Sequence, residues 1–202
     1  MKSVAVFSTL MVLVPLLMAD ELPAGYRLAS LSSGKPDINQ RDIVASNGSL
    51  VIGDNAISSV DCGPDNVAVS TCSPNTALTV VDFFPDHSCW LVESGPVAQQ
   101  LYVNDTTGAL LYHRPNSSFS PAARDGDERT GFNNSIQAID QTGTGRVTFF
   151  KNQDLQDFVG CPTDSLYYIY LNLTSVQLPK DCIPLDIVSE AVNSTLTNVY
   201  QY

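Results

Sequence analysis

The clearest β-hairpin signal in this chain of 202 residues reads Asp42-Ile43-Val44-Ala45-Ser46-Asn47-Gly48-Ser49-Leu50-Val51-Ile52-Gly53. Two runs rich in β-branched and aliphatic residues flank Asn47-Gly48, and Asn-Gly tolerates the positive φ angles that a two-residue hairpin turn requires. A second hairpin is predicted to join residues 99–104 to residues 109–113 across Asp105-Thr106-Thr107-Gly108. Further strands are predicted where β-branched and aromatic residues gather, at residues 26–32, 78–84, 146–150 and 167–173.

The rest of the chain shows almost no helical periodicity and no internal repeat. Residues 115–145 are polar and rich in turn formers, which predicts a long exposed loop with a short strand near residues 136–139. Residues 186–192 are expected to supply the only helical turn or two. The sequence therefore predicts one all-β domain, an antiparallel β-sandwich or barrel with disulfides and one long polar loop.

The first 19 residues have the pattern of a secretory signal peptide. Lys2 gives a basic start, residues 4–18 are apolar apart from Ser8 and Thr9, and Ala19 offers a small residue at the cut. The apolar run stops short of the roughly 20 residues that span a bilayer, and no second such run follows it. The C-terminal residues are too short for the apolar tail of a lipid-anchor signal. We expect a secreted, extracellular domain over residues 20–202, with no membrane span or lipid anchor.

Asn-x-Ser/Thr sequons are in excess after this leader. Thirteen asparagines follow Met18, and Ser plus Thr account for 35 of the 202 residues, so chance would place roughly two of them in sequons. Six sequons are present, none with proline at the middle position, and they begin at Asn47, Asn104, Asn116, Asn133, Asn172 and Asn193. We expect these six asparagines to be N-glycosylated.

Five cysteines are expected to be mostly paired in an oxidising compartment. Fifteen two-bridge arrangements are open to five cysteines. The nearest-neighbour scheme joins Cys62 to Cys72 and Cys161 to Cys182, which leaves Cys89. That residue is interpreted as a buried thiol beside Trp90, with a covalent link to another molecule or a different pairing scheme as the alternatives.

A sequon in a strand predicts which face of that strand meets water, because successive side chains point to opposite faces. Tyr168 and Tyr170 are expected to lie outward with Asn172, and Tyr102 outward with Asn104. The opposite, core-facing set is Tyr167, Ile169, Leu171 and Leu173 in one strand, and Leu101 and Val103 in the other. The three outward tyrosines are interpreted either as covered by the first sugars of a glycan or as a stacking surface for wall polysaccharide.

Chemistry-bearing motifs are few. The chain has no nucleophile elbow, zinc-protease helix motif, phosphate-binding glycine loop or Cys-x-x-Cys. The only histidines, His87 and His113, are interpreted as surface residues, because neighbours such as Asp86-His87-Ser88 point in different directions. A glycosidase could use the carboxylates of Asp82 and Asp86, or those of Asp125, Asp127 and Glu128. Asp125 and Asp127 lie in the most polar loop, where nothing would raise a pKa, and Ile136 stands where a calcium loop from Asp125 would need Glu, so this stretch is interpreted as a solvated turn. No catalytic, cofactor-binding or metal-ligating residue is predicted.

Net charge limits the partners. Without Lys2 the chain has 9 basic and 21 acidic residues, a net charge near −12. Such a surface repels nucleic acid and anionic lipid, and the scattered acids indicate a solvated surface rather than a cation store.

Several stretches resemble one family of fungal proteins. The matching residues are Tyr26-Arg27-Leu28-Ala29-Ser30-Leu31-Ser32-Ser33-Gly34, Ala45-Ser46-Asn47-Gly48-Ser49-Leu50-Val51-Ile52-Gly53, Leu101-Tyr102-Val103-Asn104 with Gly108-Ala109-Leu110, and Cys161-Pro162, Asp181-Cys182 and Tyr200-Gln201-Tyr202. In this order they are similar to the small secreted cell-wall proteins of filamentous fungi typified by the phialide protein PhiA, some of which are IgE-binding allergens. The chain departs from that pattern at Tyr200, where the family tends to have Trp, at the additional Cys89 and in the enlarged loop 115–145.

The resemblance implies a Cys161–Cys182 bridge and a non-enzymatic wall protein linked with conidium-forming cells. We therefore expect an N-glycosylated structural or surface protein of the fungal cell wall, with wall polysaccharide or other wall proteins as partners. Three rival interpretations are a polysaccharide-binding module, a secreted hydrolase, and an effector or allergen that acts on a host.

Overall fold

The computed structural model describes residues 25–32, 34–54, 56, 79–92, 99–112, 127–136 and 144–192. The predicted leader and the C-terminal residues 193–202 lie outside the described part. The elements are β1 (Gly25–Leu31), the 3-10 helix η1 (Pro36–Ile38), β2 (Arg41–Asp42), β3 (Val44–Ser46), β4 (Ser49–Ile52), β5 (Val80–Phe83), β6 (Cys89–Leu91), β7 (Gln99–Asn104), β8 (Leu110–Tyr112), β9 (Asp127–Glu128), β10 (Phe132–Ile136), β11 (Thr144–Lys151), β12 (Asp154–Gln156), β13 (Phe158–Thr163), β14 (Leu166–Leu171) and β15 (Ile183–Val192).

The two predicted hairpins are confirmed. Strand β3 pairs with β4 across Asn47 and Gly48, whose φ angles are 52° and 86°, so the turn uses the positive φ values that Asn-Gly tolerates. Strand β7 pairs with β8 across a loop that ends at Gly108, which has a φ of 73°. Local turn chemistry therefore sets the register of both pairs.

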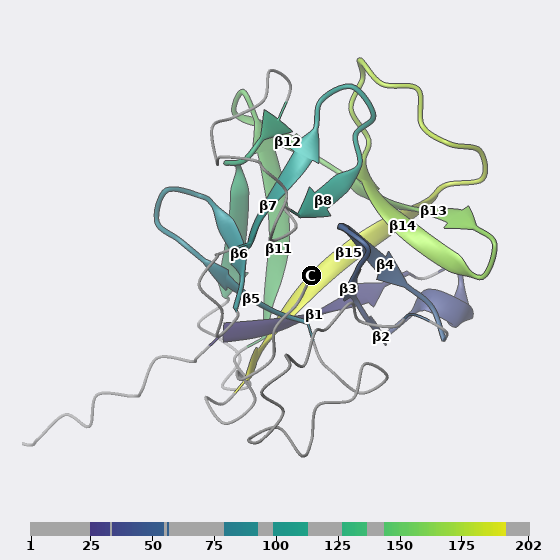
Figure 1. Cartoon of the computed structure of the whole chain (residues 1–202), viewed down its shortest axis with the longest axis horizontal. Coiled ribbons are helices and arrows are strands. Elements are labelled where there is room, and N and C mark those ends of the chain that lie inside the picture. Colours follow the sequence, from purple (N-terminus) through teal and green to yellow (C-terminus); the bar gives the residue numbers. More distant parts are fainter. Residues whose placement is uncertain are drawn as a thin grey trace, which may run out of the picture.

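Antiparallel pairing closes the sheet into a barrel, as the predicted all-β class allowed. The circuit runs β1, β15, β13, β14, β4, β8, β7, β6, β5 and back to β1. Figure 1 shows the first and the last strand, purple β1 and yellow β15, side by side, which is where the two ends of the described chain meet. Closure removes the sheet edges within this circuit, so these strands have paired neighbours on both sides.

A short sheet extends the barrel beside its last strand. The long β15 pairs with β13 through its first residues and with β11 through its later ones. Strands β10 and β12 then each pair with β11. This three-stranded extension carries both the sequon of Asn133 and the exposed Phe150.

The barrel interior is filled by aliphatic and aromatic side chains that alternate along the strands. Its fully buried members include Ile38, Leu50, Ile52, Leu101, Tyr112, Phe149, Ile169, Leu171 and Ile187. Phe132 and Phe149 meet edge to face with ring centroids 4.9 Å apart, a favoured aromatic geometry. The core therefore continues from the barrel into the β10–β11 extension.

Two expectations about the C-terminal half are wrong. Residues 186–192 belong to strand β15 and form no helical turn, because Leu185, Ile187 and Ser189 alternate inward. The range 115–145 is not a continuous loop either, since it contains β9 and β10. The short strand expected near residues 136–139 overlaps β10 at Ile136, and residues 137–139 lie outside the described part. Residues 113–126 and 137–143 lie outside the described part.

Candidate functional site

Four of the six sequon asparagines lie in the described part, and each of them reaches solvent. Asn47, Asn133 and Asn172 are exposed and Asn104 is half-buried. The other two, Asn116 and Asn193, fall outside the described residues. The positions agree with the requirement that a glycosylated asparagine faces water.

Asn104 is held by its own loop. Its Oδ1 accepts hydrogen bonds from the backbone N–H of Thr106 (3.1 Å) and of Thr107 (3.0 Å), and from Thr107 Oγ1 (3.1 Å). This Asx turn occupies the oxygen of the amide and fixes the orientation of the nitrogen to which a sugar would be joined. Asp105, the middle residue of this sequon, forms an ion pair with Lys151, which anchors the loop to the end of β11.

The tyrosines that share a strand face with a sequon lie on the expected side. Tyr168 and Tyr170 are half-buried on the same side of β14 as the exposed Asn172, while Ile169 and Leu171 between them are buried. Tyr102 is likewise half-buried between the buried Leu101 and Val103. We call Tyr102, Tyr168 and Tyr170 the tyrosine face.

Strand register joins the members of the tyrosine face. Tyr102 lies opposite Leu111, which lies opposite Ser49 of β4, and Tyr168 lies opposite Val51 of the same strand. Partial burial raises the pKa of Tyr170, and the neighbouring Tyr168 adds to the shift. The phenol of Tyr170 therefore stays neutral at physiological pH and keeps its hydrogen-bonding capacity.

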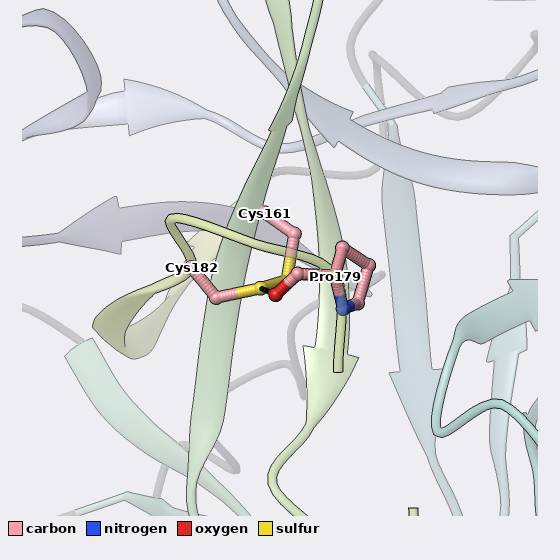
Figure 2. Close-up of a disulfide and its surroundings, with 3 residues drawn as sticks. All are labelled: Cys161, Pro179 and Cys182. Carbon is pink, nitrogen blue, oxygen red and sulfur yellow. Dashed lines mark hydrogen bonds between the residues drawn. A yellow bond between two sulfur atoms is a disulfide. The ribbon is translucent and has the colours of Figure 1, made fainter. Parts of the chain in front are cut away.

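A disulfide bridge fastens the segment before β15 to β13. Cys161 and Cys182 are bonded, as the family resemblance implied, and Figure 2 shows the bridge running from the strand to the neighbouring loop. Cys182 Sγ also lies 3.0 Å from the carbonyl oxygen of Pro179. Cys161 is fully buried, so its half of the bridge is shielded from solvent.

The remaining cysteines divide between described and undescribed parts. Cys89 is free, with a relative exposure of 1%, which confirms the buried thiol beside Trp90. Burial raises the pKa of the Cys89 thiol well above its ordinary value, and the Asp82 carboxylate adds to the shift. The thiolate is the reactive form of cysteine, so burial and the raised pKa both disfavour reaction of Cys89 in the folded chain. Cys62 and Cys72 lie outside the described residues.

A surface hollow of about 630 Å³ forms where the β5–β6 turn meets the three-stranded extension. We call it the His87 hollow. It is lined by Asp86, His87, Glu128, Thr130, Gly131, Asn133, Phe150, Lys151, Asn152 and Gln153. The fold thus gathers Asp86, His87, Glu128 and a sequon asparagine from separate stretches of the sequence.

Backbone hydrogen bonds hold the two sides of the His87 hollow together. The carbonyl oxygen of His87 accepts from the N–H groups of Gly131 and Phe132, both at 3.0 Å. His87 has a φ of 64° and closes the β5–β6 turn, with its N–H donating to the carbonyl of Phe84 at 2.9 Å. A positive φ is strained for histidine, so tertiary contacts hold this turn in shape.

Asp86 is tied to its own turn rather than to His87. Its Oδ1 accepts from Ser88 Oγ at 2.6 Å and from the Ser88 N–H at 3.0 Å, and Trp90 Nε1 donates to the same Ser88 Oγ at 2.8 Å. The hydrogen bonds from Ser88 lower the pKa of Asp86. A glycosidase acid needs a carboxyl with a raised pKa, so Asp86 is suited to accept hydrogen bonds and not to donate a proton.

A second hollow, of about 290 Å³, lies beside the sequon of Asn172. It is lined by Leu31, Ser32, Asp157, Phe158, Val159, Asn172, Pro184, Leu185 and Asp186. We call it the Asn172 hollow. Its walls come from β1, β13 and β15, which are distant in the sequence, so no local sequence signal marks it.

Other site types lack support within the described ranges. Among the residues that the structure describes, no group of three or more His, Cys, Asp or Glu side chains could hold a metal ion. No helix in that same part of the chain is both long and apolar enough to cross a membrane.

Fold and surface together define a disulfide-linked, closed antiparallel β-barrel whose described sequon asparagines reach solvent. Comparisons of the chain with protein-family models, with curated proteins and with solved structures find no match in any of the three.

Proposed function

We propose that the chain is a secreted, N-glycosylated structural or surface protein of a fungal cell wall, as the family resemblance implies. One observation carries the proposal. At the ends of β14 and β7 the sequon asparagines, Asn172 and Asn104, stand on the solvent side of strands whose alternate residues are buried in the core. A chain selected to carry sugars at these positions would keep them at the surface.

The construction of the barrel fits a protein that persists outside cells. A closed strand circuit offers few free edges to proteases or to other strands, and a disulfide restricts the unfolded chain. Ion pairs between neighbouring strands, such as Arg27 with Glu190 and Arg146 with Asp186 (2.5 Å), sit on the outer surface. The excess of acidic over basic residues attracts water and counter-ions, which suits a hydrated coat.

Cell fractionation combined with glycopeptide mapping tests this proposal. Medium, detergent-extractable wall and enzyme-released wall are separated, and the protein in each is analysed by mass spectrometry. We expect a chain that begins after Ala19, carries sugars at the described sequons and is enriched in a wall fraction. A protein found inside cells with its leader intact and its asparagines bare would refute the proposal.

A polysaccharide-binding role is the second candidate, and the tyrosine face favours it. Three half-buried tyrosines on connected strands present part of each ring to solvent, which suits stacking against sugar rings. The test is retention of the deglycosylated protein on insoluble glucan, chitin or mannan. Replacing Tyr102, Tyr168 and Tyr170 by Ala should abolish retention, whereas Phe84→Ala, which removes an exposed aromatic elsewhere, should not. Unchanged retention in the triple variant excludes this surface.

A further inference from the structure

Asn133, the first residue of its sequon, lines a preformed hollow. Asn133 is exposed on β10 and lines the His87 hollow together with Phe150 of β11. In the β10–β11 pair Phe132 lies opposite Phe149 and both are buried, so Asn133 and Thr148 face outward. Phe150 follows Thr148 on the same outer face by strand alternation.

The ring of Phe150 lacks a covering side chain across the strand. The backbone N–H of Phe150 donates to the carbonyl of Gly131 at 2.8 Å, so the residue beside Phe150 on this side is a glycine. Gly131 has a φ of 123°, and a Cβ there would clash with the backbone oxygen of Phe150, so no larger residue fits. Phe150 consequently keeps 39% of its surface exposed, and its partner on the other side, Leu155, keeps 55%.

The rim of the hollow is polar. Asn152 and Gln153 form the β11–β12 turn with φ angles of 52° and 72°, and both are exposed. Asp86 and the half-buried Glu128 add carboxylates to the lining. An apolar ring surrounded by amides and carboxylates matches a sugar, which has an apolar C–H face and a ring of hydroxyl groups. The volume of about 630 Å³ lies within the range of small-ligand sites.

We propose that the occupant of the His87 hollow is the chain's own N-glycan, with the first sugars on Asn133 lying against Phe150. This inference rests on the proposed glycosylation. A sugar attached at Asn133 is held at a high effective concentration beside the hollow, so it excludes a free saccharide of similar affinity. The Asn133 glycan thereby acts as part of the fold and covers an apolar surface that would otherwise favour association.

A double-mutant cycle on the secreted full-length protein tests the contact between glycan and ring. Asn133→Gln, Phe150→Leu and the double variant are compared by thermal unfolding, with occupancy of every sequon measured by glycopeptide mass spectrometry. We expect Asn133→Gln to lower Tm by about 2–4 °C when Phe150 is present and to have little further effect when it is Leu. Trimming the glycan to its first N-acetylglucosamine should preserve most of the stabilisation, since that sugar makes the contact.

Two matched controls separate this contact from glycosylation in general. Ser49→Ala removes the Asn47 sequon, which is not part of the hollow, and should show no coupling to Phe150→Leu. Phe84→Ala removes an exposed aromatic that does not line the hollow, and its effect should add to that of Asn133→Gln. A readout independent of folding stability is NMR, in which the aromatic ring should shift the proton signals of the first N-acetylglucosamine upfield.

The other outcomes overturn either the glycan contact alone or the proposed function together with it. If Asn133 is glycosylated but Asn133→Gln lowers Tm equally in the Phe150 and the Phe150→Leu backgrounds, the glycan contact is overturned. The proposed glycosylation is then left intact. A bare Asn133 beside occupied sequons elsewhere likewise overturns the contact alone. Chitin or glucan oligosaccharides that perturb Phe150 while the glycan is in place show a site open to outside ligands, which also overturns the contact. Six bare sequons refute the proposed function as well.

Discussion

Loss of the Cys161–Cys182 bridge should destabilise the barrel by a calculable amount. The double substitution Cys161→Ala with Cys182→Ala removes the bond without leaving a single thiol. The sequence separation of 21 residues corresponds, in the chain-entropy description, to about 3.3 kcal/mol at 25 °C. Cys161 is fully buried, so its truncation adds a packing loss of about 1 kcal/mol.

The expected total is a loss of about 4.3 kcal/mol in the free energy of unfolding. For a domain of this size, at about 2–4 °C per kcal/mol, that corresponds to a fall in Tm of about 9–17 °C. Guanidinium unfolding monitored by Trp90 fluorescence and by circular dichroism measures the free energy directly. The m value should rise, because the unfolded chain without the bridge exposes more surface.

Cys89→Ala is the matched control for this measurement. It also removes a buried sulfur, but Cys89 is free, so the variant tests packing without any change in chain connectivity. We expect a smaller loss and an unchanged m value. A bridge variant that loses less than about 1 kcal/mol, or one that behaves as Cys89→Ala does, would refute the entropic reasoning.

Three further measurements address single groups. The Cys89 thiol should react with a disulfide reagent only after unfolding, even in mildly alkaline buffer, because burial raises its pKa; rapid reaction of the folded protein would contradict this. His87→Gly should raise Tm by about 2–4 °C by relieving the positive φ of 64°, and a lowered Tm would instead reveal a stabilising contact of the imidazole. Tyr170 should ionise above its ordinary pKa of 10.0 in an ultraviolet titration, since the pKa is raised in the folded state. The contribution of Tyr170 to stability is complete below the pKa of the unfolded state and is lost as pH rises through the pKa of the folded state. Titration of Tyr170 at the same pH as exposed tyrosines would disprove the raised pKa.

The hairpins were predictable because their decisive signals are local. Asn47-Gly48 sets a two-residue turn by its own conformational preference, and the strands on both sides follow from it. For the disulfide, the residues alone left several pairings open, and the family resemblance selected the Cys161–Cys182 bridge among them. Cysteine spacing does not determine which sulfurs meet in space.

Strands β10 and β15 were missed because each has a polar residue at an inward position, and these two residues are hydrogen-bonded to each other. Ser189 interrupts the apolar alternation of β15, yet it is buried and donates to Asn134 Oδ1 of β10 at 2.7 Å. Those two residues are 55 positions apart, so neither strand shows a clean period of two by itself. Pro184 further obscured β15, although it lies at the start of the strand, where proline is tolerated.

The His87 hollow was unpredictable for a related reason. Phe150 was expected in a strand, but its exposure depends on which residue lies beside it across the β10–β11 pair. That neighbour is Gly131, which comes beside Phe150 because β10 pairs with β11. The sequence did not predict a strand at residues 132–135 of β10. Sequence reasoning can assign a side chain to a face, but only the register shows whether that face is covered.

Sequon position proved a better guide to strand faces than hydrophobic alternation. The run Leu166-Tyr167-Tyr168-Ile169-Tyr170-Leu171 is apolar or aromatic at every residue, so periodicity alone cannot orient it. The exposed Asn172 orients it correctly, and the same argument orients β7 through Asn104. In β10, where the sequence predicted a loop and no strand face, the exposed Asn133 likewise follows the buried Phe132. Glycan attachment requires solvent on one side of a strand, whereas an apolar residue is tolerated on either, so the sequon carries more information about orientation. Agreement in the two strands for which it was predicted, β7 and β14, is what a chain with functional sequons would show, and it is the reason to test occupancy before any binding activity.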